Sequence, residues 1–434
     1  MISRPMIRYL LNQPDYRVTT ATLSLDRAKQ IINGHERGMA IYHDVTNLPE
    51  TEKLVMAADI VVSLVPYQFH IDVANMCIKH RKHMVTTSYV RENMRALDEK
   101  AKEAGILLLN ECGLDPGIDH MSAMRMIHDA HSKGGKVISF HSVCGALPAP
   151  EANNNPFGYK FSWSPQGVLI ASRQSARWLE HGQEIKVNGP DLFANYHIHD
   201  VPKVGTFEDY PNRDSLPYRD AYGLQDAHTV YRGTLRLMGW CETLKTIADI
   251  GWLDESPLRD KTCKTYGDLT RYLLHAENEA DAVTAVSKHT GLKPAASAMK
   301  RIEWLGLLSK DPLPENMESP IDYLHELTLR RLPLQEGDRD MVVMHHEFTI
   351  QYEDRTEERT STLVDYGVSH DDTAVARTVT YPAAIATKML AEGKLAMTGV
   401  RIPIYPEIYN PILDELEMDY GITFIERTLP KKPK

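Results

Sequence analysis

The feature that most constrains the fold is an uninterrupted apolar run that leads into a carboxylate between two glycines. Residues 106–109 read Ile-Leu-Leu-Leu, and residues 111–120 read Glu-Cys-Gly-Leu-Asp-Pro-Gly-Ile-Asp-His. A run without polar alternation predicts a strand covered on both faces, as in a parallel sheet. Ligands of such sheets bind beyond the carboxyl ends of the strands, which makes Asp115 a candidate acid or base. An equally simple interpretation makes Asp115 the N-cap of a helix whose first residue is Pro116.

Composition points to a small-molecule partner. The 434 residues are enough for two or three domains, and 42% hydrophobic and 25% charged residues argue against disorder. A net charge of -10 gives no reason to expect nucleic acid. No apolar run approaches the roughly 20 residues needed to span a bilayer, and the first residues lack a signal-peptide core. Five scattered cysteines without metal-ligand spacing predict a cytoplasmic, reducing setting and no metal site.

The first 115 residues alternate helical and strand patterns, which predicts a doubly wound α/β fold. A helix is expected at residues 4–11, and strands are expected near residues 17–22, 39–45, 59–65, 84–89 and 106–109. A dinucleotide-binding fold normally opens with a strand and a glycine-rich turn before its first helix. Here neither a strand nor a Gly-x-Gly-x-x-Gly motif precedes the helix, so the usual cradle for a pyrophosphate is missing. We interpret this as a variant Rossmann domain shortened at its N-terminus.

The rest of the chain predicts a mixed α/β domain with a helical insert. Helices are expected at residues 295–307, 321–332 and 383–391, a long hairpin at 346–352 and 360–366, and a frayed tail at 431–434. We predict a truncated dinucleotide-binding domain at 1–115, on which a segment from about 375 to 434 packs back. The remaining predicted domains are a substrate and dimerisation domain at 116–236 and 337–374, and a helical subdomain at 237–336.

Several motifs, in order along almost the whole chain, resemble the saccharopine reductases, also called saccharopine dehydrogenases of the glutamate-forming kind. Any one of them would be weak evidence, but the set is specific. They are Ser63-Leu64-Val65-Pro66-Tyr67 with His70, Val85-Thr86-Thr87-Ser88-Tyr89, residues 113–120, Cys144-Gly145-Ala146-Leu147-Pro148-Ala149-Pro150-Glu151, Asn155-Pro156 with residues 158–164, Tyr210-Pro211-Asn212-Arg213-Asp214-Ser215, and Arg232-Gly233-Thr234-Leu235-Arg236.

The resemblance implies a pyridine-nucleotide oxidoreductase. Such an enzyme joins 2-aminoadipate 6-semialdehyde to glutamate through an imine and reduces it to saccharopine in lysine biosynthesis by the aminoadipate pathway, or runs the reverse reaction. It also implies a variant dinucleotide domain, a mixed α/β domain that binds substrate and forms a homodimer, and a small helical domain.

Matching positions suggest a substrate site. Asp115, Tyr89 and Cys144 become the candidate catalytic residues, because imine formation needs a proton delivered to a carbinolamine oxygen. Without the resemblance, Tyr89 is more simply a sheet-end tyrosine and Cys144 a small buried residue. Saccharopine carries three carboxylates, which guanidinium groups bind well. The predicted substrate contacts are Ser88, Tyr89, Asp115, Arg213, Thr234, Leu235 and Arg236, with Lys160 a weaker candidate.

Matching positions also give a cofactor site: Ile2, Ser3, Thr22, Leu23, Ser24, Asp44, Val45, Val65, Thr87, Ser88, Leu114, Asp115 and Pro116. NADP-using members commonly present an arginine to the 2′-phosphate at the position that Leu23 occupies here. Neither a cation for a phosphate nor an acid for a ribose hydroxyl is visible there, so NADP is expected by analogy and NAD is the alternative.

Two rival functions stay open at this point. One is the NAD-linked saccharopine dehydrogenase half of a lysine-degrading bifunctional enzyme. The other is a noncatalytic relative that has lost its nucleotide site.

Overall fold

The computed structural model describes residues 2–259, 262–369 and 371–430, and its contacts divide the chain into two compact units. Unit 1 comprises the residues up to 135 together with 363–425, and unit 2 comprises 136–362 and the residues from 426 onward. By these contacts the first unit runs to residue 135, whereas the predicted first domain ends at residue 115. The returning segment begins at 363 instead of about 375 and ends before the last strand. The predicted frayed tail at 431–434 lies outside the described residues.

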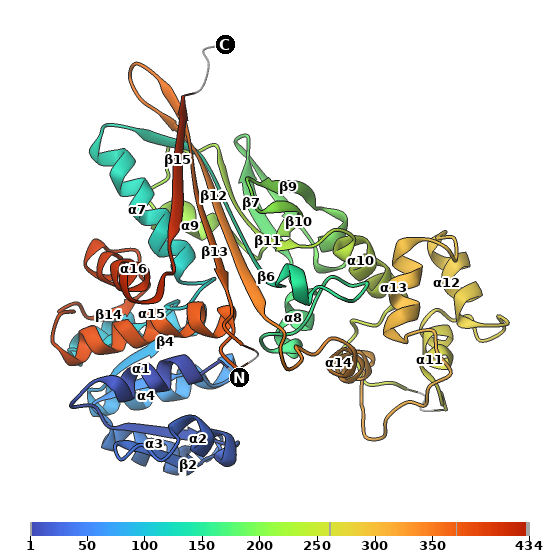
Figure 1. Ribbon diagram of the computed structural model, residues 1–434, viewed down its shortest axis with the longest axis horizontal. Coiled ribbons are helices and arrows are strands. Elements are labelled where there is room, and N and C mark those ends of the chain that lie inside the picture. The colour runs from blue at the N-terminus through green and yellow to red at the C-terminus, as the bar shows by residue number, and fades with distance from the viewer. Residues whose placement is uncertain (1, 260–261, 370, 431–434) are drawn as a thin grey trace. The chain divides into compact units, whose positions relative to one another are not determined.

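Unit 1 is an α/β unit with parallel sheets (Figure 1). Its strands are β1 (Val18–Thr22), β2 (Gly38–Tyr42), β3 (Ile60–Ser63), β4 (His83–Thr86), β5 (Leu107–Leu109) and β14 (Gly399–Arg401). Its helices are α1 (Arg4–Asn12), α2 (Leu25–Ile32), α3 (Leu48–Ala57), α4 (His70–His80), α5 (Glu92–Arg95), α6 (Asp98–Glu103), α7 (Ile118–Ser132), α15 (Ala374–Ala391) and α16 (Pro406–Tyr420). The five predicted strands and the predicted helix at 4–11 are confirmed.

The sheet of unit 1 is in two pieces, β1–β2 and β14–β5–β4–β3. In the doubly wound order, the strand that normally opens the fold lies between the strands that correspond to β1 and β3. Of residues 2 and 3, which precede α1, neither is in a strand, and β1 and β3 each pair on one side only. Among the described residues, no strand therefore lies between β1 and β3.

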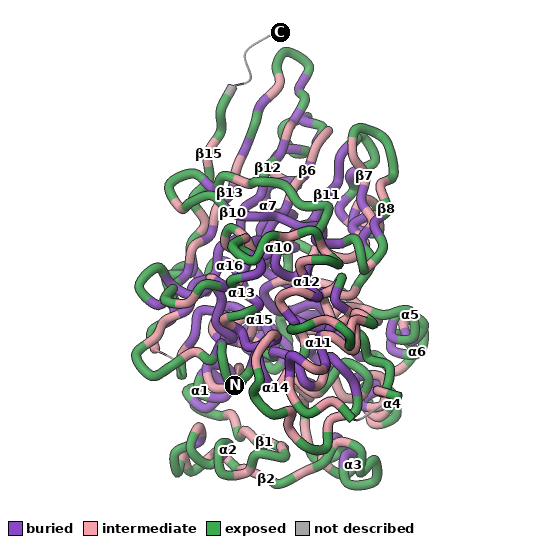
Figure 2. The backbone as a smooth tube through the Cα atoms, turned by 90° about the vertical axis from the view of Figure 1, so that its right-hand side faces the viewer, coloured by how far each residue is buried: buried purple, intermediate pink, exposed green. Residues whose placement is uncertain are grey.

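Burial differs between the two pieces of this sheet (Figure 2). All three residues of β5 are buried, whereas none of the residues in β1 is. A small cluster of Ile7, Leu11 and Ile32 supports the β1–β2 sheet from one side. The β3–β5 sheet has a larger core that includes Met84, Ile106 and Leu108. The rigid part of unit 1 is thus the part that carries the loops after β4 and β5.

One of the two interpretations of Asp115 was wrong. Helix α7 begins at Ile118 with Gly117 at its N-cap position, so Asp115 is not an N-cap and Pro116 is not the first helical residue. Backbone hydrogen bonds hold residues 113–117 in a turn that precedes the helix. The segment after residue 391 forms β14, α16 and β15 (Phe424–Pro430). Prolines at 406 and 411 obscure the helical spacing of the apolar residues buried by α16.

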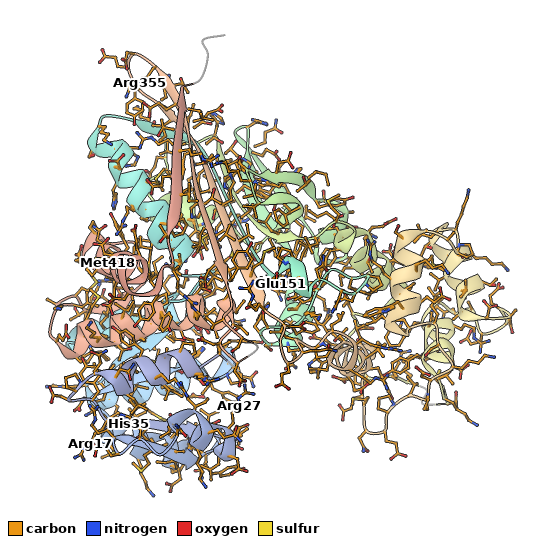
Figure 3. The ribbon with its side chains drawn as sticks, in the orientation of Figure 1. Arg17, Arg27, His35, Glu151, Arg355 and Met418 are labelled. Carbon is orange, nitrogen blue, oxygen red and sulfur yellow. The ribbon has the colours of Figure 1, made fainter. Side chains whose placement is uncertain are left out.

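Unit 2 is built on a nine-stranded sheet, seven strands of which follow the order β15–β13–β12–β6–β11–β10–β9, with β7 and β8 attached beside β11. Its strands are β6 (Lys136–Pro148), β7 (Ala176–Glu180), β8 (Gln183–Val187), β9 (His197–Val201), β10 (Gly205–Pro211), β11 (Thr229–Arg236), β12 (Asp340–Gln351), β13 (Thr356–Tyr366) and β15. The predicted hairpin is confirmed as β12–β13, with Arg355 near its tip (Figure 3).

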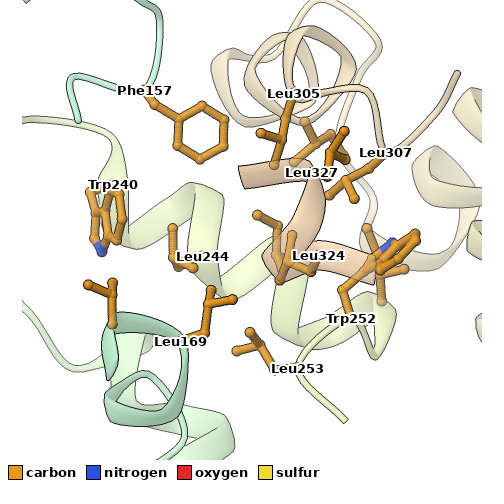
Figure 4. Close-up of a cluster of buried hydrophobic side chains, with 14 of the residues drawn as sticks. Phe157, Leu169, Trp240, Leu244, Trp252, Leu253, Leu305, Leu307, Leu324 and Leu327 are labelled. Carbon is orange, nitrogen blue, oxygen red and sulfur yellow. The ribbon is translucent and has the colours of Figure 1, made fainter. Parts of the chain in front are cut away.

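Helices of unit 2 share one apolar core (Figure 4). They are α8 (Pro165–Ala171), α10 (Trp240–Ile250), α11 (Tyr266–Leu273), α12 (Ala282–Thr290), α13 (Ser297–Leu305) and α14 (Pro320–Arg331). Helix α9 (Leu216–Ala221) contributes no residue to this core. The core joins Trp240 and Leu244 of α10 to Leu305 and Leu324 of the later helices. The predicted helices at 295–307 and 321–332 are confirmed as α13 and α14. Among the described residues, none of the helices has the length and apolarity to cross a bilayer.

Candidate functional site

Asp115 is the one residue of the stretch 106–120 that reaches the surface. Every other residue of this stretch is buried, whereas Asp115 is partly exposed. The phenolic oxygen of Tyr89 donates a hydrogen bond to Oδ1 of Asp115 at 2.7 Å. Tyr89 follows β4 and Asp115 follows β5, the neighbouring parallel strand, so both side chains stand beyond the carboxyl ends of the sheet. The structure therefore brings together two of the predicted catalytic residues.

Two glycines let the chain carry Asp115 around a tight loop. The amide of Gly113 donates to the carbonyl of Pro116 at 3.0 Å, and the amide of Ile118 donates to the carbonyl of Gly113 at 2.8 Å. A Cβ atom on Gly117 would lie 2.0 Å from the carbonyl oxygen of Gly113, and its φ is 151°. No side chain fits there, so glycine at 117 is required for the loop. The Asp115–Pro116 peptide bond is cis.

Glu111 clamps the loop after β4 to the loop after β5. Its Oε1 accepts a hydrogen bond from the amide of Val90 at 2.8 Å, and its Oε2 lies 2.8 Å from Nε2 of His120. The amide of Glu111 donates in turn to the carbonyl of Ser88 at 3.1 Å. These contacts fix the residues on either side of Tyr89. Glu111 and His120 belong to the stretch 111–120, but no role was predicted for them, because only the fold shows which loop they hold.

A buried histidine orients Ser88. Nδ1 of His70 lies 2.8 Å from the hydroxyl of Ser63, and Nε2 lies 2.8 Å from the hydroxyl of Ser88. Burial, with a smaller contribution from the positive charge of Arg91, lowers the pKa of His70 to about 4. The ring is therefore neutral at pH 7, and one of its nitrogens accepts a hydrogen bond while the other donates one. His70 was part of a recognised motif, and its place beside Ser88 was not foreseen.

The predicted cofactor residues all lie at the carboxyl ends of parallel strands or at the start of α1. Thr22 ends β1, and Leu23 and Ser24 follow it. Asp44 and Val45 follow β2, Val65 follows β3, Thr87 and Ser88 follow β4, and Leu114, Asp115 and Pro116 follow β5, while Ile2 and Ser3 precede α1. Asp44 accepts hydrogen bonds from the amide and hydroxyl of Thr46, which lower its pKa. The arrangement is that of a dinucleotide-binding edge.

The turn after β1 offers an exposed leucine where a phosphate-binding cation is expected. The side chain of Leu23 is 61% exposed. The nearest cation along the chain is Arg27, an exposed residue of α2 (Figure 3). A guanidinium at that position is the most direct candidate in this turn for a contact with a 2′-phosphate.

In unit 2, one face of the sheet carries a row of cationic and polar side chains. Arg232, Thr234 and Arg236 alternate along β11 and so point to the same face. The register places Cys144 of β6 and Tyr210 of β10 directly opposite Thr234. Three predicted residues, Cys144, Thr234 and Arg236, thus meet on this face, and Tyr210 lies beside Thr234. Arg232, which sequence reasoning did not select, joins them because of the two-residue period of the strand.

Leu235 faces the other way. Its side chain is fully buried in an apolar cluster with Val143 and Tyr231, on the opposite face from Arg236. Only its backbone is on the side of the arginines, where its carbonyl oxygen accepts a hydrogen bond from Nη1 of Arg236 at 2.8 Å. A substrate contact by Leu235 would therefore have to be made by its main chain.

Arg236 is a buried cation held by aromatic rings. Its side chain is about 4% exposed, and its guanidinium carbon lies 5.1 Å from the ring centre of Tyr159, 5.3 Å from that of Trp240 and 5.9 Å from that of Tyr210. Its Nε is buried without a hydrogen-bond partner among the described residues. Cation–π contacts compensate part of the cost of burying this charge. A carboxylate ligand would supply the missing acceptor.

The two other predicted cations, Arg213 and Lys160, differ in how well they suit substrate binding. Arg213 follows β10 and adopts a left-handed backbone with φ of 58°, a conformation that costs a non-glycine residue about 1–3 kcal/mol. Backbone strain of this kind is often found at functional positions. Lys160, in contrast, places Nζ 2.5 Å from Oδ2 of Asp338 in a nearly buried ion pair. Its charge is already matched, which counts against a role in holding substrate.

A cavity of about 320 Å³ lies elsewhere in unit 1, and none of the predicted site residues lines it. It is lined by residues of α1 that include Arg4 and Arg8, by residues 368, 369 and 372 before α15, by Tyr381 of α15 and by Tyr420 at the end of α16. We assign it no part in the site.

Family models match both parts of the chain. The model for the saccharopine dehydrogenase NADP binding domain matches residues 1–109, and the model for the saccharopine dehydrogenase C-terminal domain matches residues 113–422. The chain belongs to the saccharopine dehydrogenase family. The resemblance drawn from the motifs is confirmed.

Relatives of known function agree over nearly the full length. Saccharopine dehydrogenase [NADP(+), L-glutamate-forming] of Schizosaccharomyces pombe is 35% identical over 99% of this chain and 98% of its own length. The apo structure of saccharopine dehydrogenase (L-Glu forming) from Saccharomyces cerevisiae superposes with a TM-score of 0.88 at 36% identity, over 99% of this chain and 97% of that chain. Alpha-aminoadipic semialdehyde synthase of Arabidopsis thaliana is 39% identical over 95% of this chain but over only 41% of its own length.

Proposed function

We propose that this family member is a saccharopine dehydrogenase (NADP, L-glutamate-forming). In the oxidative direction, saccharopine, NADP⁺ and water give 2-aminoadipate 6-semialdehyde, glutamate, NADPH and a proton; the reductive direction serves lysine biosynthesis by the aminoadipate pathway. The observation that carries the proposal is the Tyr89–Asp115 hydrogen bond at the strand ends, where a dinucleotide fold places its reacting groups. The fungal relatives that match at 35–38% identity carry the name saccharopine dehydrogenase [NADP(+), L-glutamate-forming], which supports this activity.

The Tyr89–Asp115 pair is suited to proton transfer. In the biosynthetic direction the amine of glutamate adds to the aldehyde, and the resulting carbinolamine must lose its oxygen as water. We propose that Tyr89 or Asp115 delivers a proton to that oxygen and, in reverse, accepts a proton from the attacking water. NADPH, when bound, supplies the hydride that reduces the imine. The partly exposed carboxylate on an otherwise buried loop combines a fixed position with access to substrate.

We propose that guanidinium groups bind the carboxylates of the substrate. Saccharopine has three carboxylates, and unit 2 offers Arg213, Arg232 and Arg236, of which Arg236 keeps a buried nitrogen in need of an acceptor. Thr234 and Ser88 add hydroxyl donors, and Cys144 contributes a small side chain to the sheet face. Cys144 stays a candidate for substrate contact on the strength of its position opposite Thr234.

The direct test is enzymatic. The purified chain is given saccharopine with NADP⁺ or NAD⁺, NADPH or NADH formation is followed by absorbance, and glutamate is identified as the product by mass spectrometry. We expect saccharopine-dependent reduction of NADP⁺ to be faster than that of NAD⁺. A preference for NAD⁺ would favour the lysine-degrading activity. Failure of either nucleotide to bind in a fluorescence titration would leave the noncatalytic relative as the better description.

We also propose a homodimer located in the cytoplasm. Five free cysteines, four of them buried, are compatible with a reducing compartment. The edge strand β9 exposes Ile198, with Tyr196 just before it, and β15 exposes Leu429 at the other edge. Apolar side chains on an edge strand favour pairing with another chain. Light scattering of the purified protein tests the dimer, and fractionation of cells that express the natural chain tests the compartment.

A further inference from the structure

Unit 2 contains a group of metal-ligating side chains that the proposed reaction does not use. His199 lies on β9, and His345 and Glu347 lie on β12. One nitrogen of each ring and one carboxylate oxygen all lie within 4.8 Å of one another. Three strands separate β9 from β12 in hydrogen-bonding order, so these residues meet only because the sheet is strongly curved. The rings of His199 and His345 are 5.6 Å apart, centre to centre.

Both histidines present a nitrogen that lacks a partner. Nε2 of His199 and Nε2 of His345 are buried and accept or donate no hydrogen bond among the described residues. A buried polar atom without a partner costs about 1–3 kcal/mol. The carboxylate of Glu347 approaches Nε2 of His345 to 3.6 Å, which is too long for a hydrogen bond. Two buried ring nitrogens without a hydrogen-bond partner among the described residues thus belong to a group of three potential metal ligands.

A hydroxyl stands behind one of the two rings. Nδ1 of His345 lies 2.8 Å from the hydroxyl of Thr362, which leaves the lone pair on Nε2 when Nδ1 carries the proton. Hydrogen-bond partners of this kind behind ligating imidazoles are usual in zinc sites. Oδ2 of Asp209 lies 3.9 Å from Nδ1 of His199.

We propose that His199, His345 and Glu347 form a Zn²⁺ site that ties β9 to β12 across the curved face of the sheet. Two imidazoles and one carboxylate are a common zinc ligand set, with a fourth position for water. Ligand atoms about 2 Å from a tetrahedral ion are about 3.3 Å apart, so the observed 3.6 Å between His345 and Glu347 needs little change. The side chain of Glu347 is 47% exposed, which gives the ion a route in from solvent. This proposal is independent of the proposed enzymatic function.

The other titratable groups near the site leave its ligand set unchanged. His141 and His197 share the same face, and Tyr231 donates a hydrogen bond to Asp209 at 3.1 Å. Glu347 is the acidic member of the site, with its carboxylate 3.6 Å from Nε2 of His345. One carboxylate and two imidazoles are ligands that suit a divalent transition-metal ion.

The test is zinc binding by the full chain, prepared without a polyhistidine tag and treated with a chelator. The protein is titrated with Zn²⁺ in competition with a chromophoric chelator, and bound zinc is counted by mass spectrometry. We expect about one high-affinity Zn²⁺ per chain. Glu347→Gln and His199→Gln should each weaken binding at least about tenfold, and Thr362→Val should weaken it by a smaller factor. His289→Gln, which changes an exposed histidine of α12, is the matched control and should bind as the wild type does.

A second measurement covers the case in which a variant folds poorly. Co²⁺ bound in this site should give the intense visible absorption of a four-coordinate ion, and Zn²⁺ should raise the melting temperature of the wild type but not of Glu347→Gln. Glu347 is half exposed, so its amide variant should fold even where the buried His199 variant does not. Absence of zinc binding by the wild type, or equal binding by the wild type and Glu347→Gln, would overturn the proposal.

Discussion

Tyr89 donates a hydrogen bond of 2.7 Å to Asp115 from the end of one parallel strand to the end of its neighbour. The backbone clamp through Glu111 fixes both loops, so the contact depends on the fold and not only on the two side chains. In the proposed mechanism this pair provides a proton donor and an acceptor that exchange roles as the reaction runs forward or back.

Removal of either partner should affect turnover more than stability. Tyr89→Phe and Asp115→Asn keep the shapes of the side chains, and we expect each to lower kcat by about 10²–10⁴-fold. Steady-state oxidation of saccharopine, with melting temperature measured in parallel, checks this. Tyr405→Phe changes an exposed tyrosine of the same unit and serves as the control. Wild-type kcat in both site variants would remove the pair from the mechanism.

Arg236→Lys should raise the KM for saccharopine and leave the affinity for NADPH unchanged. Lysine keeps the charge but loses the planar fork that binds a carboxylate through two hydrogen bonds. We expect a change of about tenfold or more, measured by initial rates and by fluorescence titration of NADPH. Arg355→Lys, at the exposed tip of the β12–β13 hairpin, is the same substitution away from the site. A KM equal to that of the control would place Arg236 outside the substrate site.

Arg213→Gly separates strain from binding. Glycine adopts a φ of 58° without strain, so this variant should unfold at a temperature equal to or above that of the wild type. Loss of the guanidinium should weaken saccharopine binding by about tenfold or more. Calorimetric melting and a saccharopine titration report the two effects separately. Unchanged saccharopine affinity would show that Arg213 does not hold the substrate.

Leu23→Arg should strengthen binding of NADPH relative to NADH. An arginine at this exposed turn would offer the 2′-phosphate a second cation beside Arg27, and only NADPH carries that phosphate. A gain of several-fold in the NADPH to NADH affinity ratio is expected, and fluorescence titration measures it. Leu329→Arg adds the same charge at an exposed leucine of α14 and should leave the ratio unchanged. An equal ratio in both variants would place the 2′-phosphate away from this turn.

His70 should make the protein less stable below pH 6.5. Its folded pKa of about 4 is below the unfolded value of 6.5, so the unfolded chain takes up a proton first as the pH falls. The stability that His70 contributes is complete above pH 6.5 and is lost between pH 6.5 and pH 4, up to about 3 kcal/mol. Urea unfolding of His70→Gln should show a shallower pH dependence over this range, while His131→Gln should follow the wild type. Parallel pH profiles for all three proteins would contradict this assignment.

The sequence by itself determined the local elements and the family. The run 106–109, the alternation in 346–352 and the apolar face of residues 4–11 are patterns of one strand or one helix, and each folds as its own period dictates. In α16, prolines interrupt the helical spacing of the apolar residues, so the sequence pattern alone did not predict that helix.

Only the tertiary structure decided which side chains meet. Tyr89 reaches Asp115 because β4 and β5 are neighbours, Leu235 turns away from Arg236 because of strand register, and His199 reaches His345 because the sheet curves. A helix or strand repeat acts over a few residues, whereas pairing, register and curvature join segments that lie far apart in the chain. The residue types of the site were therefore visible in the sequence, and their partners were fixed by packing.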